Sequence, residues 1–114
     1  MILKLDKKDV VRTVEKYYKK ISNLDSKAYM GLIYDKDSSQ VYPYVKLEKR
    51  RGKFIDSDYL TEDNLKEVFG YTYNCKVNNI SFDKEPYVNV NASNIDDNLY
   101  GMRLDISHLK KRKK

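Results

Sequence analysis

Apolar and polar residues alternate in three stretches of the C-terminal half of the chain. The three runs are Tyr71–Val77, Val88–Ala92 and Met102–Ile106. A period of two places successive side chains on opposite faces of a strand, so the runs predict three antiparallel strands with one apolar and one polar face. The apolar positions change from odd to even numbers at Asn78 and Asn79, which predicts a β-bulge.

Apolar residues with helical spacing predict three helices in the rest of the chain. The predicted helices are Lys7–Ile21, Asp25–Tyr34 and Leu60–Phe69. Each start has a capping residue between two apolar residues that can close the first turn; the caps are Asp6, Asp25 and Thr61. In the second helix Gly31 leaves a strand as the alternative. Gly70 is expected as the left-handed residue that ends the third helix.

A further strand is predicted at Gln40–Glu48, where Val41, Val45 and Leu47 lie on one side. Pro43 lacks an N–H group and cannot donate to a ladder, so this strand should lie at an edge or contain a bulge. Arg50–Gly52 is expected to form a hairpin turn, with Lys53–Ile55 returning.

Together these elements predict one α+β domain over residues 1–109. A long N-terminal helix and two shorter helices should pack on a curved antiparallel sheet of about four to five strands. The alternation places Tyr73 and Val90 under the first helix. Although 35% of the 114 residues are charged, eleven tyrosines and three phenylalanines supply large side chains for a core.

The net charge of +6 is located mainly in the C-terminal tail, residues 110–114, which we expect to be disordered. Without those five cations, 18 Lys and Arg residues remain against 17 Asp and Glu residues, so the rest of the chain is nearly neutral. The candidate anion-binding or nucleic-acid-binding residues are Lys46, Lys49, Arg50, Arg51, Lys53, Lys110, Lys111, Arg112, Lys113 and Lys114. The candidate stacking residues are Tyr42, Tyr44 and Phe54. A basic hairpin that protects a sheet edge from aggregation is the alternative.

No catalytic set is recognisable in the sequence. Cys75 is the single cysteine and is expected to be buried and inert, and His108 is the single histidine. We therefore predict no metal site and no cofactor. The sequence has no signal peptide and no apolar run long enough for a transmembrane segment. These features predict a cytoplasmic protein if the chain is complete, and an extracytoplasmic one if it is an excised domain.

The order of the predicted elements resembles that of the nuclear transport factor 2-like superfamily, whose curved sheet wraps a long first helix into a cone. The resemblance is carried by Val10–Tyr18, by Asn23–Asp25 and by the final segment Gly101–Lys111. Members include isomerases and dehydratases, protein-binding transport factors, and soluble domains of conjugation and type IV secretion components. Fold similarity of this kind does not choose among those functions.

Two functions follow as hypotheses. The first is a non-enzymatic binding or accessory module that acts through protein or nucleic-acid contacts, with a DNA-transfer or secretion assembly as the setting that the resemblance implies. The alternative is a small-molecule-binding protein or a lyase or isomerase of the cone type. The expected partners are a protein, a second copy of the chain, and weakly bound nucleic acid. The homodimer is expected because no strand follows Leu99–Leu109 to cover its edge.

Overall fold

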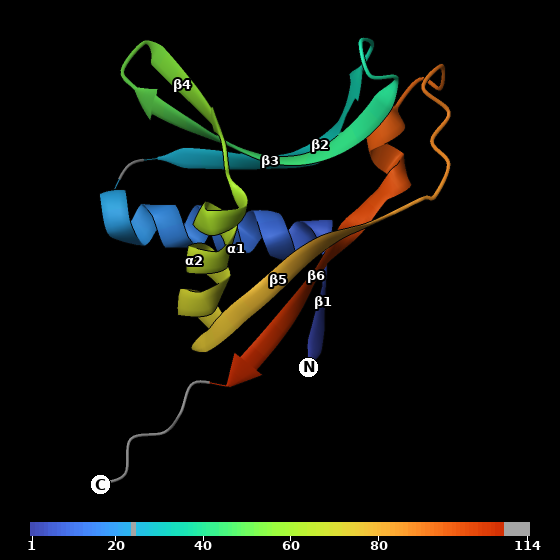
Figure 1. Cartoon of the computed structure of the whole chain (residues 1–114). Coiled ribbons are helices and arrows are strands. Elements are labelled where there is room, and N and C mark those ends of the chain that lie inside the picture. The colour runs from blue at the N-terminus through green and yellow to red at the C-terminus, as the bar shows by residue number, and fades with distance from the viewer. Residues whose placement is uncertain (24, 109–114) are drawn as a thin grey trace, which may run out of the picture.

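The computed structural model describes residues 1–23 and 25–108, and the predicted tail at 110–114 lies outside the described residues. Within this part the chain forms two α-helices, six strands and one 3₁₀ helix (Figure 1). The elements are β1 (Ile2–Asp6), α1 (Lys7–Ser22), β2 (Ser26–Asp35), β3 (Gln40–Arg51), β4 (Phe54–Tyr59), α2 (Glu62–Tyr73), β5 (Cys75–Lys84), η1 (Ile95–Asn98) and β6 (Leu99–His108).

The strands form two antiparallel three-stranded sheets, in the orders β1–β6–β5 and β2–β3–β4. Figure 1 shows α1 between the two sheets, with α2 crossing close to it. A single core joins them, because Val10 and Val14 of α1, Phe69 of α2, Val45 of β3 and Leu104 of β6 are all 0 to 1% exposed. The α+β class is therefore confirmed, whereas the packing of the helices on one curved sheet is wrong.

The first helix forms where the sequence predicts it. Asp6 caps its N-terminus by accepting a hydrogen bond from the Asp9 N–H at 2.8 Å. Val10, Val14 and Tyr17 fall on the buried face, as their spacing requires. The apolar periodicity and the capping residue predict the same helix, so the local sequence is sufficient to define it.

Two local features of the strands are also confirmed. The register of β5 with β6 shifts between Val77 and Asn79, which is the expected bulge. The hairpin between β3 and β4 turns at Gly52, whose φ of 61° is readily adopted by glycine. Cys75 is 6% exposed, in agreement with the expected buried thiol.

The predicted helix at 25–34 is wrong, because Ser26–Asp35 forms strand β2. Ten consecutive residues of β2 pair with β3, from Ser26 opposite Lys49 to Asp35 opposite Gln40. Ala28 and Leu32 are compatible with either a helical or a strand face, and pairing with β3 selects the strand. The alternative that Gly31 left open is therefore the correct one.

The predicted strand at Tyr71–Val77 is wrong in its first half. Helix α2 begins after the predicted cap Thr61 but continues past Gly70 to Tyr73, and Asn74 ends it with a φ of 49°. Asn, like glycine, tolerates the left-handed conformation at this position. Tyr73 is consequently on a helix and 39% exposed rather than under α1.

The second predicted strand of the C-terminal half, Val88–Ala92, is not a strand, and Val90 is half-buried in the connection between β5 and η1. Strand β1, which the sequence analysis did not predict, pairs with β6 from Ile2 opposite Asp105 to Asp6 opposite Gly101. β6 is therefore the middle strand of its sheet. The open edge that suggested a homodimer through the last strand is covered by β1.

Candidate interaction surface

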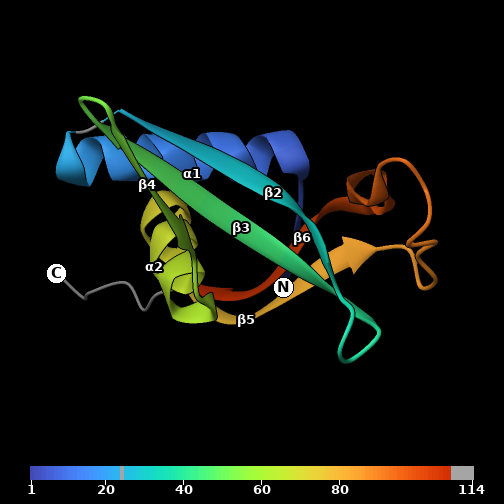
Figure 2. The ribbon, with the colours of Figure 1, turned by 90° about the horizontal axis from the view of Figure 1, so that it is seen from above.

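The face of the β2–β3–β4 sheet that points away from α1, here called the outer face, gathers aromatic, apolar and charged side chains from three strands. Residues directly opposite in a ladder share a face, so the registers define its members. They are Lys27, Tyr29, Ile33, Tyr42, Tyr44, Lys46, Glu48, Arg50, Ile55, Ser57 and Tyr59. Figure 2 looks onto this sheet from above, with α1 and α2 behind it.

Large apolar side chains are exposed on the outer face to an unusual degree. The exposed fractions are 38% for Tyr29, 39% for Ile33, 46% for Tyr42, 56% for Ile55 and 60% for Tyr59. Such a cluster on one face of a sheet differs from isolated exposed apolar residues, which are common on any protein surface. This face is therefore the candidate interaction surface of the protein.

The outer face of the β1–β6–β5 sheet provides an internal comparison. Its paired positions around Arg103 and Asp105 carry Lys4, Asn79, Ser81 and one exposed apolar residue, Ile2. The two sheets thus have the same strand number but different outer chemistry. Ile2 at 57% and Tyr100 at 48% are the exposed isoleucine and tyrosine of that sheet, whereas five such side chains gather on the outer face of the β2–β3–β4 sheet.

Contacts among its side chains order the outer face. The Lys46 Nζ lies 5.2 Å from the ring centroid of Tyr29 and 3.7 Å from a carboxylate oxygen of Glu48. The rings of Tyr44 and Tyr59 meet edge to face, with centroids 5.5 Å apart and an interplanar angle of 86°. Side chains held by such contacts lose less conformational entropy when a partner binds.

The hydroxyl of Tyr44 lies over Gly31, next to Asp96 of η1. A Cβ atom at Gly31 would stand 2.8 Å from this hydroxyl and 2.6 Å from the Asp96 Oδ1 atom, so a larger residue would displace these two side chains. Burial raises the pKa of Tyr44, the negative charge of Asp96 raises it further, and Lys46 opposes the change. The phenol is therefore kept neutral and available as a hydrogen-bond group.

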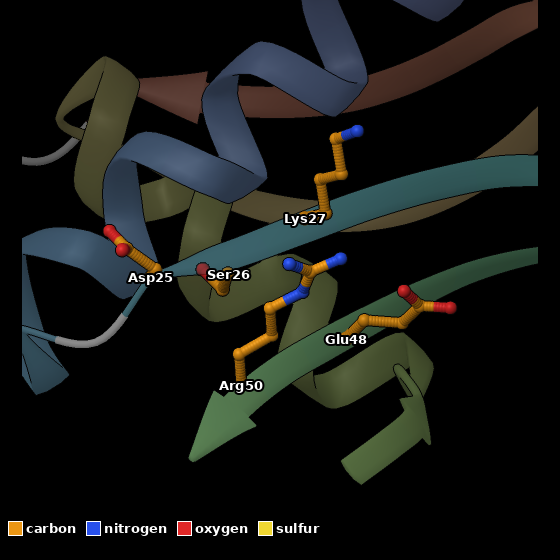
Figure 3. Close-up of a pocket in the computed structure, with 5 residues that line it drawn as sticks. All are labelled: Asp25, Ser26, Lys27, Glu48 and Arg50. Atoms are coloured by element: carbon orange, nitrogen blue, oxygen red, sulfur yellow. The ribbon is translucent and has the colours of Figure 1, made fainter. Parts of the chain in front are cut away.

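A polar cavity of about 250 Å³ opens at one end of the outer face. Its lining residues are Asp25, Ser26, Lys27, Glu48 and Arg50. Figure 3 shows the Arg50 side chain reaching from β3 toward Ser26 and Lys27 on β2. Both signs of charge line the cavity, so it can accept a polar side chain of a partner with its own hydrogen-bond groups.

The free edge of β2 is closed to further strands. The Ala28 N–H donates to the Glu15 Oε2 atom at 2.9 Å, and the Leu32 N–H donates to the Asp96 Oδ1 atom at 2.7 Å. Side-chain carboxylates thus occupy two donors that an added strand would need. Covering an edge in this way is a common protection against strand addition.

The opposite side of this sheet, formed by β4 and by the part of β3 that β4 does not cover, is protected differently. The Leu32 N–H points away from β3, so Leu32 and its partner Pro43 form a pair without hydrogen bonds between the two strands. The nitrogen of Pro43 consequently faces away from β2, and its missing N–H group costs no bond to that strand. The predicted edge position or bulge of this strand is wrong, because β3 is the middle strand of its sheet and its register with β2 is unbroken. The proline is tolerated because β4 pairs only with Lys46–Arg51, which leaves the β4 side of β3 open at Pro43. Asp56 and Asp58 of β4 share a face with Lys49 and Leu47 on the helix side, and such inward charges resist strand addition.

The structure separates the sequence-predicted basic cluster into two groups. Tyr42, Tyr44, Lys46 and Arg50 lie together on the outer face. The others lie on the opposite side or at the hairpin tip; they are Lys49, Arg51, Lys53 and Phe54. Alternation along β3 causes this division, since neighbours in sequence point to opposite faces. The candidates at 110–114 lie outside the described residues.

Sequence reasoning missed the contribution of β2 and β4 to the outer face. Lys27, Tyr29 and Ile33 were assigned to a helix, and Tyr59 was assigned to no element. The signal that identifies the first three is the alternation with Ala28, Met30 and Leu32. The pattern in this stretch fits both periods, and only the pairing with β3 distinguishes them.

The interior offers little support for a cone-type pocket. The space between α1 and the sheets is filled by core side chains such as Val14, Phe69, Met102 and Leu104, each 0 to 1% exposed. A groove of about 250 Å³ opens at the surface beside β3; it is lined by Pro43, Tyr44, Val45, Leu60, Glu62, Leu65, Ile80 and Phe82. This volume lies below the roughly 300 to 1,000 Å³ of ordinary small-molecule sites.

Metal and membrane chemistry find no support in the described part of the chain. Over residues 1–23 and 25–108, no group of three or more His, Cys, Asp or Glu side chains could hold a metal ion. Neither of the α-helices found there combines the length and apolar character needed to cross a bilayer.

Comparison with protein-family models, with curated proteins and with solved structures found no match. The resemblance to the nuclear transport factor 2-like superfamily therefore stays a prediction. The function has to be argued from the surface itself.

Proposed function

We propose that this protein is a non-enzymatic binding module that engages a folded protein partner through the outer face of the β2–β3–β4 sheet. The observation that carries the proposal is the exposure of Tyr29, Tyr42, Tyr59, Ile33 and Ile55 on one ordered sheet face. Tyrosine and arginine are enriched where protein interfaces bind most tightly, because they bury large area and donate hydrogen bonds.

The balance of charge favours a protein over a nucleic acid at this face. Its cations are Lys27, Lys46 and Arg50, its anion is Glu48, and Asp35 follows on the same side at the end of β2. Lys46 is already paired with Glu48 at 3.7 Å. A nucleic-acid surface requires unpaired cations to neutralise phosphates, whereas an aromatic centre with a mixed polar rim is typical of protein interfaces.

The protected edges define how the partner binds. Carboxylates occupy the β2 donors at Ala28 and Leu32, and Pro43 denies a donor on β3. A partner that adds a strand would meet these obstacles at each edge. We therefore expect contact across the face, with side chains of the partner packed on the tyrosine rings.

The experiment places a photo-crosslinking residue, benzoylphenylalanine, at Tyr42 or Tyr59 of the full chain in cells that produce it. Matched control positions are Ser81 and Lys4 on the outer face of the other sheet. We expect positions 42 and 59 to give one defined crosslinked product with another protein, and both control positions to lack it. The crosslinked protein is then identified and purified.

The second step measures affinity for that product. Tyr59→Ala and Arg50→Ala should each weaken binding about tenfold or more, the size expected for residues at the centre of an interface. Lys4→Ala on the other sheet should leave the affinity unchanged. Equal products from both faces, or a product that contains only a second copy of the chain, would show that the assignment of the outer face is wrong.

A further inference from the structure

A second surface, separate from the outer face, lies at the end of the molecule that the C-terminal turns of α1 share with the hairpin between β3 and β4. We call it the basic end; its residues are Lys16, Lys19, Lys20, Lys49, Arg51 and Lys53. Figures 1 and 2 both show the hairpin and the C-terminal turns of α1 at the same end of the molecule. The Lys49 Nζ lies 5.8 Å from the ring centroid of Tyr18, which connects the hairpin to α1.

The positive charges of the basic end are not neutralised by ion pairs. The three ion pairs in the described residues join the Met1 amine to Asp105, Lys46 to Glu48, and Arg103 to Asp83. Of the nearby acids, Glu15 accepts from the Ala28 N–H and Glu67 accepts from the Tyr17 hydroxyl. Asp25 is exposed beside Lys16 and Lys19 and belongs to none of the three ion pairs. Asp56 opposes Lys49 across the ladder without a direct contact between their charges.

Ordinary helix stability explains only part of this cluster. Lys19 and Lys20 lie in the last turn of α1, where cations interact favourably with the helix dipole. The dipole does not require Lys16, and it does not act on Arg51 or Lys53 at the tip of the hairpin. The presence of cations from two elements at one end of the molecule needs a different explanation, and a polyanion supplies one.

Aromatic rings and a hollow accompany these cations. The Lys20 Nζ lies 5.0 Å from the ring centroid of Tyr71, and Phe54 at the hairpin tip is 77% exposed. A hollow of about 250 Å³ between α1 and the start of β2 is lined by Arg12, Glu15, Lys16, Lys19, Asp25 and Ser26. Among the described residues, the buried Ser26 Oγ atom has no hydrogen-bond partner.

We propose that the basic end binds the phosphate backbone of single-stranded nucleic acid without reading its sequence. The cations contact phosphates, and the exposed ring of Phe54 stacks on a base, as in other single-strand sites. The site uses a different surface and a different ligand from the protein-binding face. The three α1 lysines are contacts that the linear basic cluster did not contain.

The test is fluorescence anisotropy of a labelled mixed-sequence single-stranded oligonucleotide with the full chain over a series of salt concentrations. One variant removes the α1 cations through Lys16→Gln, Lys19→Gln and Lys20→Gln. A second removes the tip cations through Arg51→Gln and Lys53→Gln. The control variant, with Lys4→Gln, Lys8→Gln and Lys76→Gln, loses the same charge as the first at exposed sites away from the basic end.

Each phosphate contact on a single strand contributes about 0.7 to the slope of log affinity against log salt. The α1 variant should therefore lower the slope by up to about 2, and the tip variant by up to about 1.4. Both should bind more weakly than the control, which should keep the slope of the unmodified chain. Circular dichroism on each variant verifies that the domain remains folded.

Two results would overturn the proposal. The first is an equal loss of affinity and slope in the α1 variant and the control, which would mean that only net charge matters. The second is binding of phosphatidylserine vesicles by the basic end without binding of the oligonucleotide, which would identify an anionic membrane as the ligand. Neither result affects the crosslinking expected at the outer face.

Discussion

Removing the carboxylate of Asp96 should destabilise the domain by opening the free edge of β2. The Asp96 Oδ1 atom accepts the Leu32 N–H at 2.7 Å, and Leu32 is 5% exposed, so water cannot easily replace the bond. In Asp96→Ala this part-buried donor loses a charged partner. Such losses cost about 1.5 to 3 kcal/mol, and we expect a decrease of about 2 kcal/mol in the free energy of unfolding.

Two further variants separate the hydrogen bond from other effects. Asp96→Asn retains an acceptor oxygen, so it should lose only about 1 kcal/mol, the difference between charged and neutral bonds. Asp97→Ala changes the next residue, which is exposed, and should stay within about 0.5 kcal/mol of the unmodified chain. The Lys7 Nζ donates to the main-chain oxygen of Asp96 at 3.0 Å, and this contact survives in all three.

Urea denaturation measures the free energies, and amide hydrogen exchange measures the local effect. For a domain of 114 residues, 2 kcal/mol corresponds to a decrease in Tm of about 8 °C. The Leu32 amide should exchange faster in Asp96→Ala than in Asp97→Ala. Equal stability of these two variants, together with an unchanged Leu32 amide, would refute the claim that Asp96 closes this edge.

Two other predictions follow from burial. In urea denaturation, Phe69→Ala should lower the free energy of unfolding by about 3 to 5 kcal/mol and Tyr73→Ala by less than about 1 kcal/mol, because Phe69 is 0% and Tyr73 39% exposed. Similar losses in the two variants would mean that Tyr73 is a core residue after all. Burial raises the pKa values of Tyr17, Tyr18 and Tyr44 above the ordinary 10.0. These phenols therefore ionise at lower pH in the unfolded chain than in the folded one, so the free energy of unfolding should decrease as the pH rises above about 10. NMR titration that places all three phenols at or below the ordinary value would contradict this.

Local signals identified several elements of this protein without reference to the rest of the fold. Helix α1 has both a cap at Asp6 and an apolar stripe, and the two signals agree over 16 residues. Gly52 marks the hairpin turn, and the change of phase at Asn78 marks the bulge. For the helix and the turn the decisive interactions lie within a few residues of the chain. The bulge is formed in the pairing with the distant strand β6, but the change of phase in the apolar positions reveals it in the sequence.

The errors occurred where a local pattern fits two structures. Ser26–Asp35 satisfies both a helical and a strand period, and its pairing with β3 over ten residues decides between them. Tyr71 and Tyr73 alternate with polar residues like a strand, yet α2 continues through them to Asn74. Hydrogen bonding between strands and continuation of a helix both depend on neighbours that a short window does not contain.

The candidate surface shows the same limit. The sequence by itself determined the residue types of the basic and aromatic cluster, the α+β class, the first helix and the hairpin. Only the tertiary structure assigned Lys46 and Arg50 to one face and Lys49 and Arg51 to the other, and brought Tyr29 and Tyr59 beside Tyr44. The physical reason is that alternation separates neighbours along one strand, whereas ladder pairing joins residues that are distant in sequence.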